Sequence, residues 1–387
     1  MANAKHDQIT LRRSIMENRI KDILRTSIIG IVINIVLALF KILLGTLAHS
    51  LSVLMDGINN LADAGSGLIT MVGTALAGRP ADKKHPFGYG RLEYLSSLVI
   101  SGLILYAGIT SAVESVKAIL SPEQPDYSTL TLVVIAVAVF VKLFLALYTQ
   151  AQGKKLNSDS MVASGKDALM DVVLSITTLV GAGLFMLTGL ALEPYLAAVI
   201  SLIIIKAGLE LLKETISKII GEPADIQLVI DIKNTIKAFP GVHGAFDLIL
   251  NNYGPDSFFA SVHVEVDDSM TVKEIDELSR EVTDTVHKKH GVILTAVGFY
   301  SHNTADPAIA ELETALSTLA LEQPFVNGIH GIYANLSDKQ LRFDLVMSFD
   351  APSRADAFSA AMEAIRHAYP EYDVTASMDV DFNELKE

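Results

Sequence analysis

The stretch LMDGINNLADAGSG, residues 54–67, places polar side chains inside a segment that is apolar enough to cross a membrane. These side chains are Asp56, Asn59, Asn60 and Asp63. A carboxylate near the centre of a bilayer-spanning helix costs roughly 2.5–3.5 kcal/mol on insertion scales. Such a group is retained where it faces a bundle interior and meets a cation, a proton or a polar partner. The stretch therefore predicts a buried polar site in a membrane domain.

A second apolar segment repeats the arrangement. KDALMDVV, residues 166–173, carries Asp167 and Asp171 four residues apart, the same spacing that separates Asn59 from Asp63. On a helix this spacing puts both side chains on one face, one turn apart. Two such helices facing each other would form a membrane-buried site of four oxygen-bearing side chains.

The other polar residues of the first segment have different expected roles. Asp56 lies nearer the outer end, where it could serve an access path for ions or make a helix-packing bond. Asn60 lies about 100° around the helix from Asn59, so we do not expect it to share the face of the site. A lysine or neighbouring helix hydroxyls could also satisfy Asp63, which would give this carboxylate a structural role.

The composition indicates a membrane protein with a soluble part. Half of the 387 residues are apolar, the mean hydropathy is +0.40, and only 19% are charged. The net charge of −14 argues against nucleic acid as a partner. The absence of cysteine excludes disulfides and thiolate metal sites. The first twenty residues lack the apolar core of a signal peptide, so we expect the first span to direct insertion.

Six apolar segments approach or exceed the ~20 residues that a helix needs to cross a bilayer. The predicted spans are 26–48, 51–77, 93–119, 129–150, 165–189 and 193–213, after a mixed-charge helix over residues 1–24. Lysine and arginine occur in alternate connections only, so the positive-inside rule places both termini in the cytoplasm. We therefore expect residues 1–220 to form an α-helical membrane bundle.

After Gly221 the pattern becomes that of a soluble α+β domain. A helix over 225–239, strands over 246–254 and 258–266, a helix over 270–291 and a strand over 292–300 are predicted. This αββαβ order is that of a ferredoxin-like, open-faced sandwich over residues 221–304. The order recurs over residues 305–387, which we interpret as a second copy of the domain.

Two expectations concern particular side chains of the soluble region. Phe343, Leu345 and Met347 form an apolar strand face in the second copy, which would add interface or form that copy's own core. The three histidines His302, His330 and His367 are expected to be exposed and carry no functional prediction.

The connection PADKKHPFGYGRLE, residues 80–93, together with the second and fifth spans, resembles the cation diffusion facilitator family. The resemblance covers roughly residues 12–303. It implies a homodimeric, six-span exporter of divalent metals with a cytoplasmic αββαβ domain. It also implies a transport site of two residues from each of these two spans, which here are Asn59, Asp63, Asp167 and Asp171.

Departures from the family pattern bear on the metal. Zinc-exporting members usually have histidine in the transport site, whereas this chain has amide and carboxylate oxygens, which suit harder cations such as Mn²⁺. The sequence thus resembles the manganese branch, with Fe²⁺, Co²⁺ and Zn²⁺ left open.

Secondary metal sites of the family look degraded. Asp82 and His85 remain in the connection, but Tyr89 replaces a usual histidine there. His263 alone matches the cytoplasmic cluster of zinc-binding members, and Phe246 and Gly298 stand where other ligands would be. We therefore do not expect a binuclear zinc site in this domain, and His85 could simply cap the connection.

The predicted function is Mn²⁺ export from the cytoplasm by alternating access, coupled to protons, in a multi-pass protein of the cell membrane. The expected partners are a second copy of the chain, divalent ions, protons and the lipid bilayer, with no cofactor besides the transported ion. No nucleotide-binding loop G-x-x-x-x-G-K-[ST] occurs. Alternatives are an Fe²⁺ or Zn²⁺ exporter, an intramembrane aspartyl protease, and a metal sensor or structural membrane protein without flux.

Overall fold

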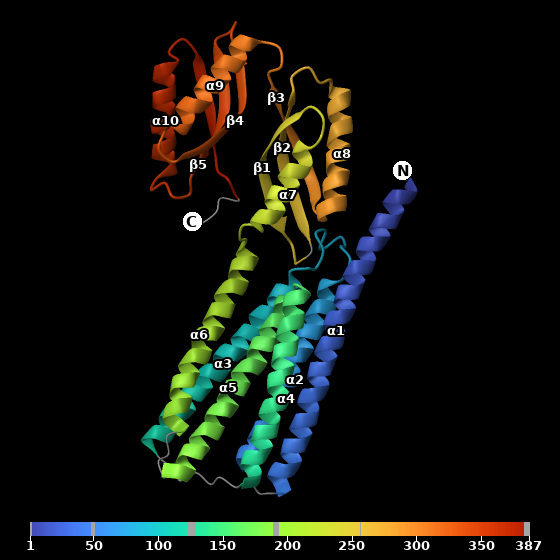
Figure 1. The fold of residues 1–387 in the computed structure, drawn as a ribbon, viewed down its shortest axis with the longest axis vertical. Coiled ribbons are helices and arrows are strands. Elements are labelled where there is room, and N and C mark those ends of the chain that lie inside the picture. Colours follow the sequence, from blue (N-terminus) through green and yellow to red (C-terminus); the bar gives the residue numbers. More distant parts are fainter. Residues whose placement is uncertain (1, 48–50, 122–128, 189–192, 256, 383–387) are drawn as a thin grey trace. The chain divides into compact units, whose positions relative to one another are not determined.

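The structure, a computed structural model, describes residues 2–47, 51–121, 129–188, 193–255 and 257–382. Within helix 51–77 the side chains of residues 51–59 lie outside the described part. The chain divides into two compact units, each with its own fold (Figure 1). One unit comprises residues 1–221 with 253–256, and the other comprises 222–252 with 257–387.

Long helices make up the first unit. In the described part of the chain they are α1 Ala2–Leu47, α2 Leu51–Ala77, α3 Leu92–Leu120, α4 Thr129–Lys155, α5 Asp159–Thr188 and α6 Glu193–Ile220. By length and composition, five stretches among the described residues could cross a membrane: Asn18–Leu44, Leu92–Leu120, Leu132–Lys155, Asp159–Phe185 and Pro194–Ile220. The sixth span, α2, stays a prediction. Helix α1 runs without a break, so residues 2–24 are not a separate helix.

These helices pack mainly in neighbouring pairs. Buried isoleucines join α3 to α6, and Val139 of α4 packs against Val172 of α5. Helices α4 and α5 also approach closely at Gly165, where a Cβ atom would lie 2.8 Å from the backbone nitrogen of Gln150. Small residues allow this kind of contact between membrane helices. The pairing brings the polar faces of α2, α4 and α5 together.

The second unit contains helices and strands in a repeated order. The elements are α7 Ile226–Lys237, β1 Val242–Asn252, β2 Phe258–Asp267, α8 Val272–His290, β3 Ile293–His302, α9 Pro307–Leu321, β4 Val326–Asn335, β5 Gln340–Met347, α10 Arg354–Ala368 and β6 Asp373–Asp379. The strands form two sheets of orders β1-β2-β3 and β4-β5-β6. In each, the first pair is antiparallel and the second is parallel.

Local sequence explains several of these boundaries. Helix α8 begins with a capping box, in which Thr271 and Glu274 satisfy each other's backbone N–H groups, and it ends at Gly291 in the left-handed conformation (φ 71°). The helix was predicted over 270–291; it begins two residues later and ends where expected, before Gly291. Strand β1 was expected to begin at residue 246 and begins at Val242, because the PGVHG segment continues into extended structure after the turn.

Each sheet has its own hydrophobic core beneath its two helices. Alternate residues of β2 (Ala260, Val262, Val264 and Val266) are buried with residues of α7 and α8. Leu345 of β5 lies with Phe343 and Met347 in the core under α9 and α10. Of the two alternatives for these three side chains, interface or core, the structure has the second, because they form the core of their own sheet. The element order repeats, while a duplication as its origin stays a prediction.

Candidate metal centre

The described carboxylates of the predicted transport site come from α2 and α5, as expected. Asp63 is on α2, and Asp167 and Asp171 stand one turn apart on α5. Asp63 and Asp167 line one cavity of about 40 Å³, which is large enough for an ion or a water molecule. Asp63 and Asp171 share a partner, the side chain of Lys142. The structure therefore brings all three carboxylates to one region of the helical unit.

Lys142 of α4 is the feature that sequence reasoning missed. Its Nζ lies 2.5 Å from Oδ2 of Asp63 and 3.1 Å from Oδ2 of Asp171, and its side chain is only 4% exposed. The alternative in which a lysine satisfies Asp63 is thus present in the structure. The signal in the sequence was a lone lysine within the apolar stretch VAVFVKLFLAL, because membrane spans keep such charges only with a partner.

Hydroxyl groups line the cavity on the side of the α2 C-terminus and the α5 N-terminus. Ser66 donates to Oδ2 of Asp167 at 3.0 Å. Thr70 lies 2.7 Å from the hydroxyl of Ser164 and donates to the carbonyl of Ser160 at 3.2 Å. This row of oxygen atoms leads along α2 and α5 to the carboxylates. These oxygen atoms can replace the hydration water of a cation while the cation moves toward the carboxylates.

The remaining polar residues of α2 differ in what the structure shows. The side chains of Asp56 and Asn59 lie outside the described part, so their predicted roles stay predictions. Asn60 is fully buried, and its amide has no hydrogen-bond partner among the described side chains. A buried amide without a hydrogen-bond partner costs about 1–3 kcal/mol of stability. A neighbouring group or a bound ion that contacts the Asn60 amide would remove this cost.

The charges at this site suit a divalent cation. Asp63, Asp167 and Asp171 supply up to three negative charges, and Lys142 supplies one positive charge. A buried excess of negative charge is expensive unless a cation or protons balance it. Carboxylate and hydroxyl oxygens are the ligands of hard divalent ions. The three carboxylates can bind such an ion, and Lys142 supplies a positive charge to them when no ion is bound.

The connection between α2 and α3 also brings its predicted residues together. Tyr89 donates to Oδ2 of Asp82 at 2.7 Å and lies 2.7 Å from Nδ1 of His85. Oδ1 of Asp82 accepts from the backbone N–H groups of Lys84 and His85, each at 2.8 Å. These hydrogen bonds lower the pKa of Asp82, the one from Tyr89 most strongly. The contacts give the three residues a role in closing the loop, and a metal role for Asp82 and His85 stays a prediction.

In the second unit His263 lies on β2, where its Nδ1 is 2.6 Å from Oδ2 of Asp247. A Cβ atom on Gly298 would lie 2.0 Å from the His263 ring, so glycine leaves the space that the imidazole fills. The expectation of an exposed His330 was wrong. Its side chain is 3% exposed, because it lies on the sheet face opposite α9 and α10 and Phe246 and Tyr300 of the first sheet cover it. His367 is exposed, as expected.

Comparison with known families agrees with this arrangement. A family model described as "Cation efflux transmembrane domain" matches residues 27–220, and one described as "Cation efflux protein, cytoplasmic domain" matches residues 225–297. The helical bundle with its acidic site and the α/β domain define a membrane transporter of metal cations. The chain belongs to the cation efflux family, also called cation diffusion facilitators.

Several curated relatives align over most of their length. The manganese efflux system proteins MneS and MneP of Bacillus subtilis are 26% and 23% identical over 283 and 273 residues. These alignments cover 73% and 68% of this chain and 94% and 91% of the relatives. Metal tolerance protein 2 of Oryza sativa is 26% identical over 291 residues, covering 68% of this chain and 75% of the relative.

Proposed function

We propose that this cation efflux protein exports divalent cations, with Mn²⁺ as the main cargo, in exchange for protons. The observation that carries the proposal is that Asp63 and Asp167 line one small cavity, while Asp63 and Asp171 share one buried ammonium group. The fourth proposed ligand is Asn59, one turn before Asp63 on α2. Similarity to two manganese efflux proteins supports the choice of metal.

The ligand chemistry favours Mn²⁺ over Zn²⁺. The proposed ligands offer oxygen atoms only, whereas imidazole nitrogen is the common protein ligand for zinc. Oxygen ligands discriminate poorly among Mn²⁺, Fe²⁺ and Co²⁺, so Fe²⁺ is the second candidate. Zn²⁺ export is the less favoured alternative.

Charge balance supports exchange rather than uniport. Carboxylates must be deprotonated to hold a metal ion, so protons and metal compete for the same oxygen atoms. In the inward-facing state the carboxylates would take the cation from the cytoplasm. In the outward-facing state, protonation of the carboxylates would release the cation. The ammonium group of Lys142 would then replace part of the positive charge that leaves with the cation.

The proposed assembly is a homodimer in the cell membrane with both termini in the cytoplasm. The match to the family's cytoplasmic domain supports dimerisation, and the distribution of lysine and arginine supports the orientation. We propose that residues 305–387 are a second copy of the αββαβ domain of residues 221–304. The repeated element order and the repeated sheet order support this.

The contact of Lys142 with both carboxylates speaks against an aspartyl protease. Such an enzyme needs two aspartates that share a proton between them. Here an ammonium group pairs with Oδ2 of both Asp63 and Asp171. Each of the two carboxylates thus faces a cation of the protein, an arrangement that suits cation binding.

Flux into proteoliposomes tests the proposal. The full chain, reconstituted with an internal metal-sensitive dye, should transport Mn²⁺ faster than Zn²⁺ at equal free concentration. An opposing proton gradient should accelerate Mn²⁺ flux, and a protonophore should abolish the acceleration. Metal flux that does not change with pH between about 6 and 8 would contradict exchange with protons and indicate uniport. Absence of any metal flux would favour the alternative of a metal sensor or a structural membrane protein.

A further inference from the structure

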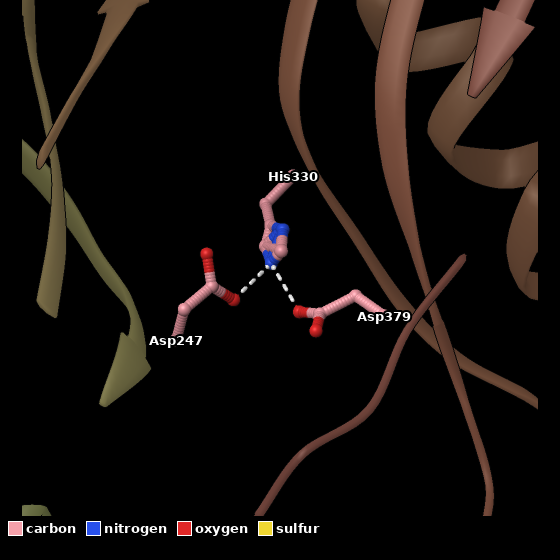
Figure 2. Close-up of side chains that lie close together, drawn as sticks. All are labelled: Asp247, His330 and Asp379. Atoms are coloured by element: carbon pink, nitrogen blue, oxygen red, sulfur yellow. Dashed lines mark hydrogen bonds and ion pairs between the residues drawn. The ribbon is translucent and has the colours of Figure 1, made fainter. Parts of the chain in front are cut away.

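A second polar cluster lies in the α/β unit, where side chains of both sheets meet. Asp247 of β1, His330 of β4 and Asp379 of β6 point toward one another (Figure 2). Nε2 of His330 is 2.6 Å from Oδ1 of Asp247 and 3.5 Å from Oδ2 of Asp379. One potential ligand atom from each residue lies within 4.8 Å of the others. Ligand atoms at about 2.0–2.2 Å from a shared ion would be spaced on this scale.

We propose that Asp247, His330 and Asp379 form a binding site for a divalent transition-metal ion that joins the two sheets of the cytoplasmic unit. Each half of the unit contributes ligands, one from the first sheet and two from the second. The site is separate from the transport residues of the helical unit and does not depend on the proposed function. Neither half could form it alone.

The cluster has more negative charge than its described neighbours balance. Asp344 of β5 adds a third carboxylate, 2.7 Å from the hydroxyl of Tyr300. That same hydroxyl is 3.0 Å from Asp247, so its single proton serves one carboxylate at a time. In the described part of the chain, no lysine or arginine forms an ion pair with Asp247 or Asp379. A divalent ion would balance two of these charges.

The imidazole is suited to binding a metal. His330 is buried, with a side chain that is 3% exposed. An uncharged imidazole offers a lone pair, and Nε2 is the atom that faces the two carboxylates. Its Nδ1 is buried with no partner among the described residues. This histidine is therefore incompletely satisfied by protein groups.

Space for an ion adjoins the three residues. Asp247, His330 and Asp379 line a cavity of about 220 Å³, together with Asn327 and Lys233. This volume holds an ion and several water molecules, which would complete the coordination left by three protein ligands and could satisfy Nδ1 of His330. In the described structure Lys233 makes no ion pair with either carboxylate, so it does not fill the role of the cation.

The backbone also directs Asp247 toward this point. Asp247 has φ 52°, in the left-handed region, at a register irregularity between Phe246 and Ile249 of β1. An irregularity of this kind re-aims a side chain, and a non-glycine residue in the left-handed region costs of order 1–3 kcal/mol. A bound ion would offset part of that cost. One imidazole and two carboxylates favour Mn²⁺, Fe²⁺ or Zn²⁺ over Mg²⁺, which prefers oxygen ligands only.

Metal counting on the purified full chain tests the proposal. The transport site is first disabled by Asp63→Asn with Asp171→Asn, and bound Mn²⁺ and Zn²⁺ are then measured by equilibrium dialysis. Adding His330→Asn or Asp379→Asn should remove about one ion per chain, or weaken its binding at least about tenfold. His367→Asn, an exposed histidine of α10, is the matched control and should change neither quantity.

A second measurement covers variants that fail to fold. Anomalous X-ray scattering from the wild-type protein with bound Mn²⁺ should show an ion between Asp247, His330 and Asp379. Thermal unfolding of the α/β unit should also shift upward with Mn²⁺ in wild type and not in Asp379→Asn. Equal ion counts in all variants, or anomalous density at the transport site alone, would show that the cluster is only a hydrogen-bond network.

Discussion

The ammonium group of Lys142 lies 2.5 Å from Oδ2 of Asp63, between two helices that carry the proposed metal ligands. The same group reaches Asp171 at 3.1 Å. The positively charged ammonium group of Lys142 thus lies next to the proposed binding site of the divalent ion. The incoming ion must displace this ammonium or share the carboxylates with it, which links the resting state of the site to its affinity for metal.

Replacing Lys142 by methionine should tighten Mn²⁺ binding. Two unit charges 4 Å apart interact with about 4 kcal/mol at an effective dielectric constant of 20, so removing the repulsion should raise affinity about tenfold or more. Release should slow, so turnover should fall even as the concentration for half-maximal flux decreases. Equilibrium Mn²⁺ binding and initial flux rates measure the two effects. Lys206→Met, at an exposed position of α6, is the control. Unchanged affinity would show that Lys142 only packs the helices.

Removing either carboxylate that contacts Lys142 should abolish transport. In Asp63→Ala or Asp171→Ala one of the negative charges that offset a divalent ion is lost, and we expect Mn²⁺ flux at the level of empty liposomes. The protein should still insert and dimerise, which size-exclusion chromatography in detergent can establish. Glu210→Ala, at an exposed position on α6, should transport normally. Wild-type rates in both aspartate variants would mean that the transport site lies elsewhere.

The fold was predictable to the extent that it depends on local patterns. Apolar stretches and their flanking charges predict the long helices, and the glycine at position 291 predicts where α8 ends. The start of β1 was missed, because PGVHG looks like a continuous break. Only Gly241 needs a left-handed conformation (φ 75°), and the strand begins at Val242 directly after it.

The partners within each site were harder to predict. Lys142 is 79 residues from Asp63, and His330 is 83 residues from Asp247. Spacing within a helix or strand predicts which side chains share a face, but it does not predict which distant segment covers that face. His330 is buried by residues of the other sheet, a contact that the alternation of its own strand does not encode.

Arg19 should stabilise the helical unit through a buried ion pair. Its Nη2 donates to both carboxylate oxygens of Glu93 at 3.1–3.2 Å, and its guanidinium also donates to the carbonyls of Leu156 and Asn157. Glu93 is 1% exposed, so Arg19→Met leaves a buried charge without its partner, at a cost on the order of 3 kcal/mol. The midpoint of thermal unfolding in detergent should fall by several degrees, compared with no change in the exposed Arg25→Met control.

A double variant separates this ion pair from other effects of the substitution. Adding Glu93→Gln to Arg19→Met removes the unpaired charge and should recover part of the lost stability. If Arg19→Met alone unfolds at the wild-type temperature, the pair contributes little, and packing holds α1 against the start of α3.

Exchanging oxygen ligands for imidazole should change the preferred cargo. Asn59→His with Asp167→His would supply two nitrogen ligands, one on α2 and one on α5, while Asp63 and Asp171 keep two carboxylates. Because imidazole favours Zn²⁺ relative to Mn²⁺, the ratio of Zn²⁺ to Mn²⁺ flux should rise by about tenfold or more. Competition flux assays on wild type and variant measure the ratio. Lys206→His, at an exposed position of α6, is the control and should leave the ratio unchanged. A wild-type protein that already prefers Zn²⁺ would contradict the argument that oxygen ligands set the selectivity.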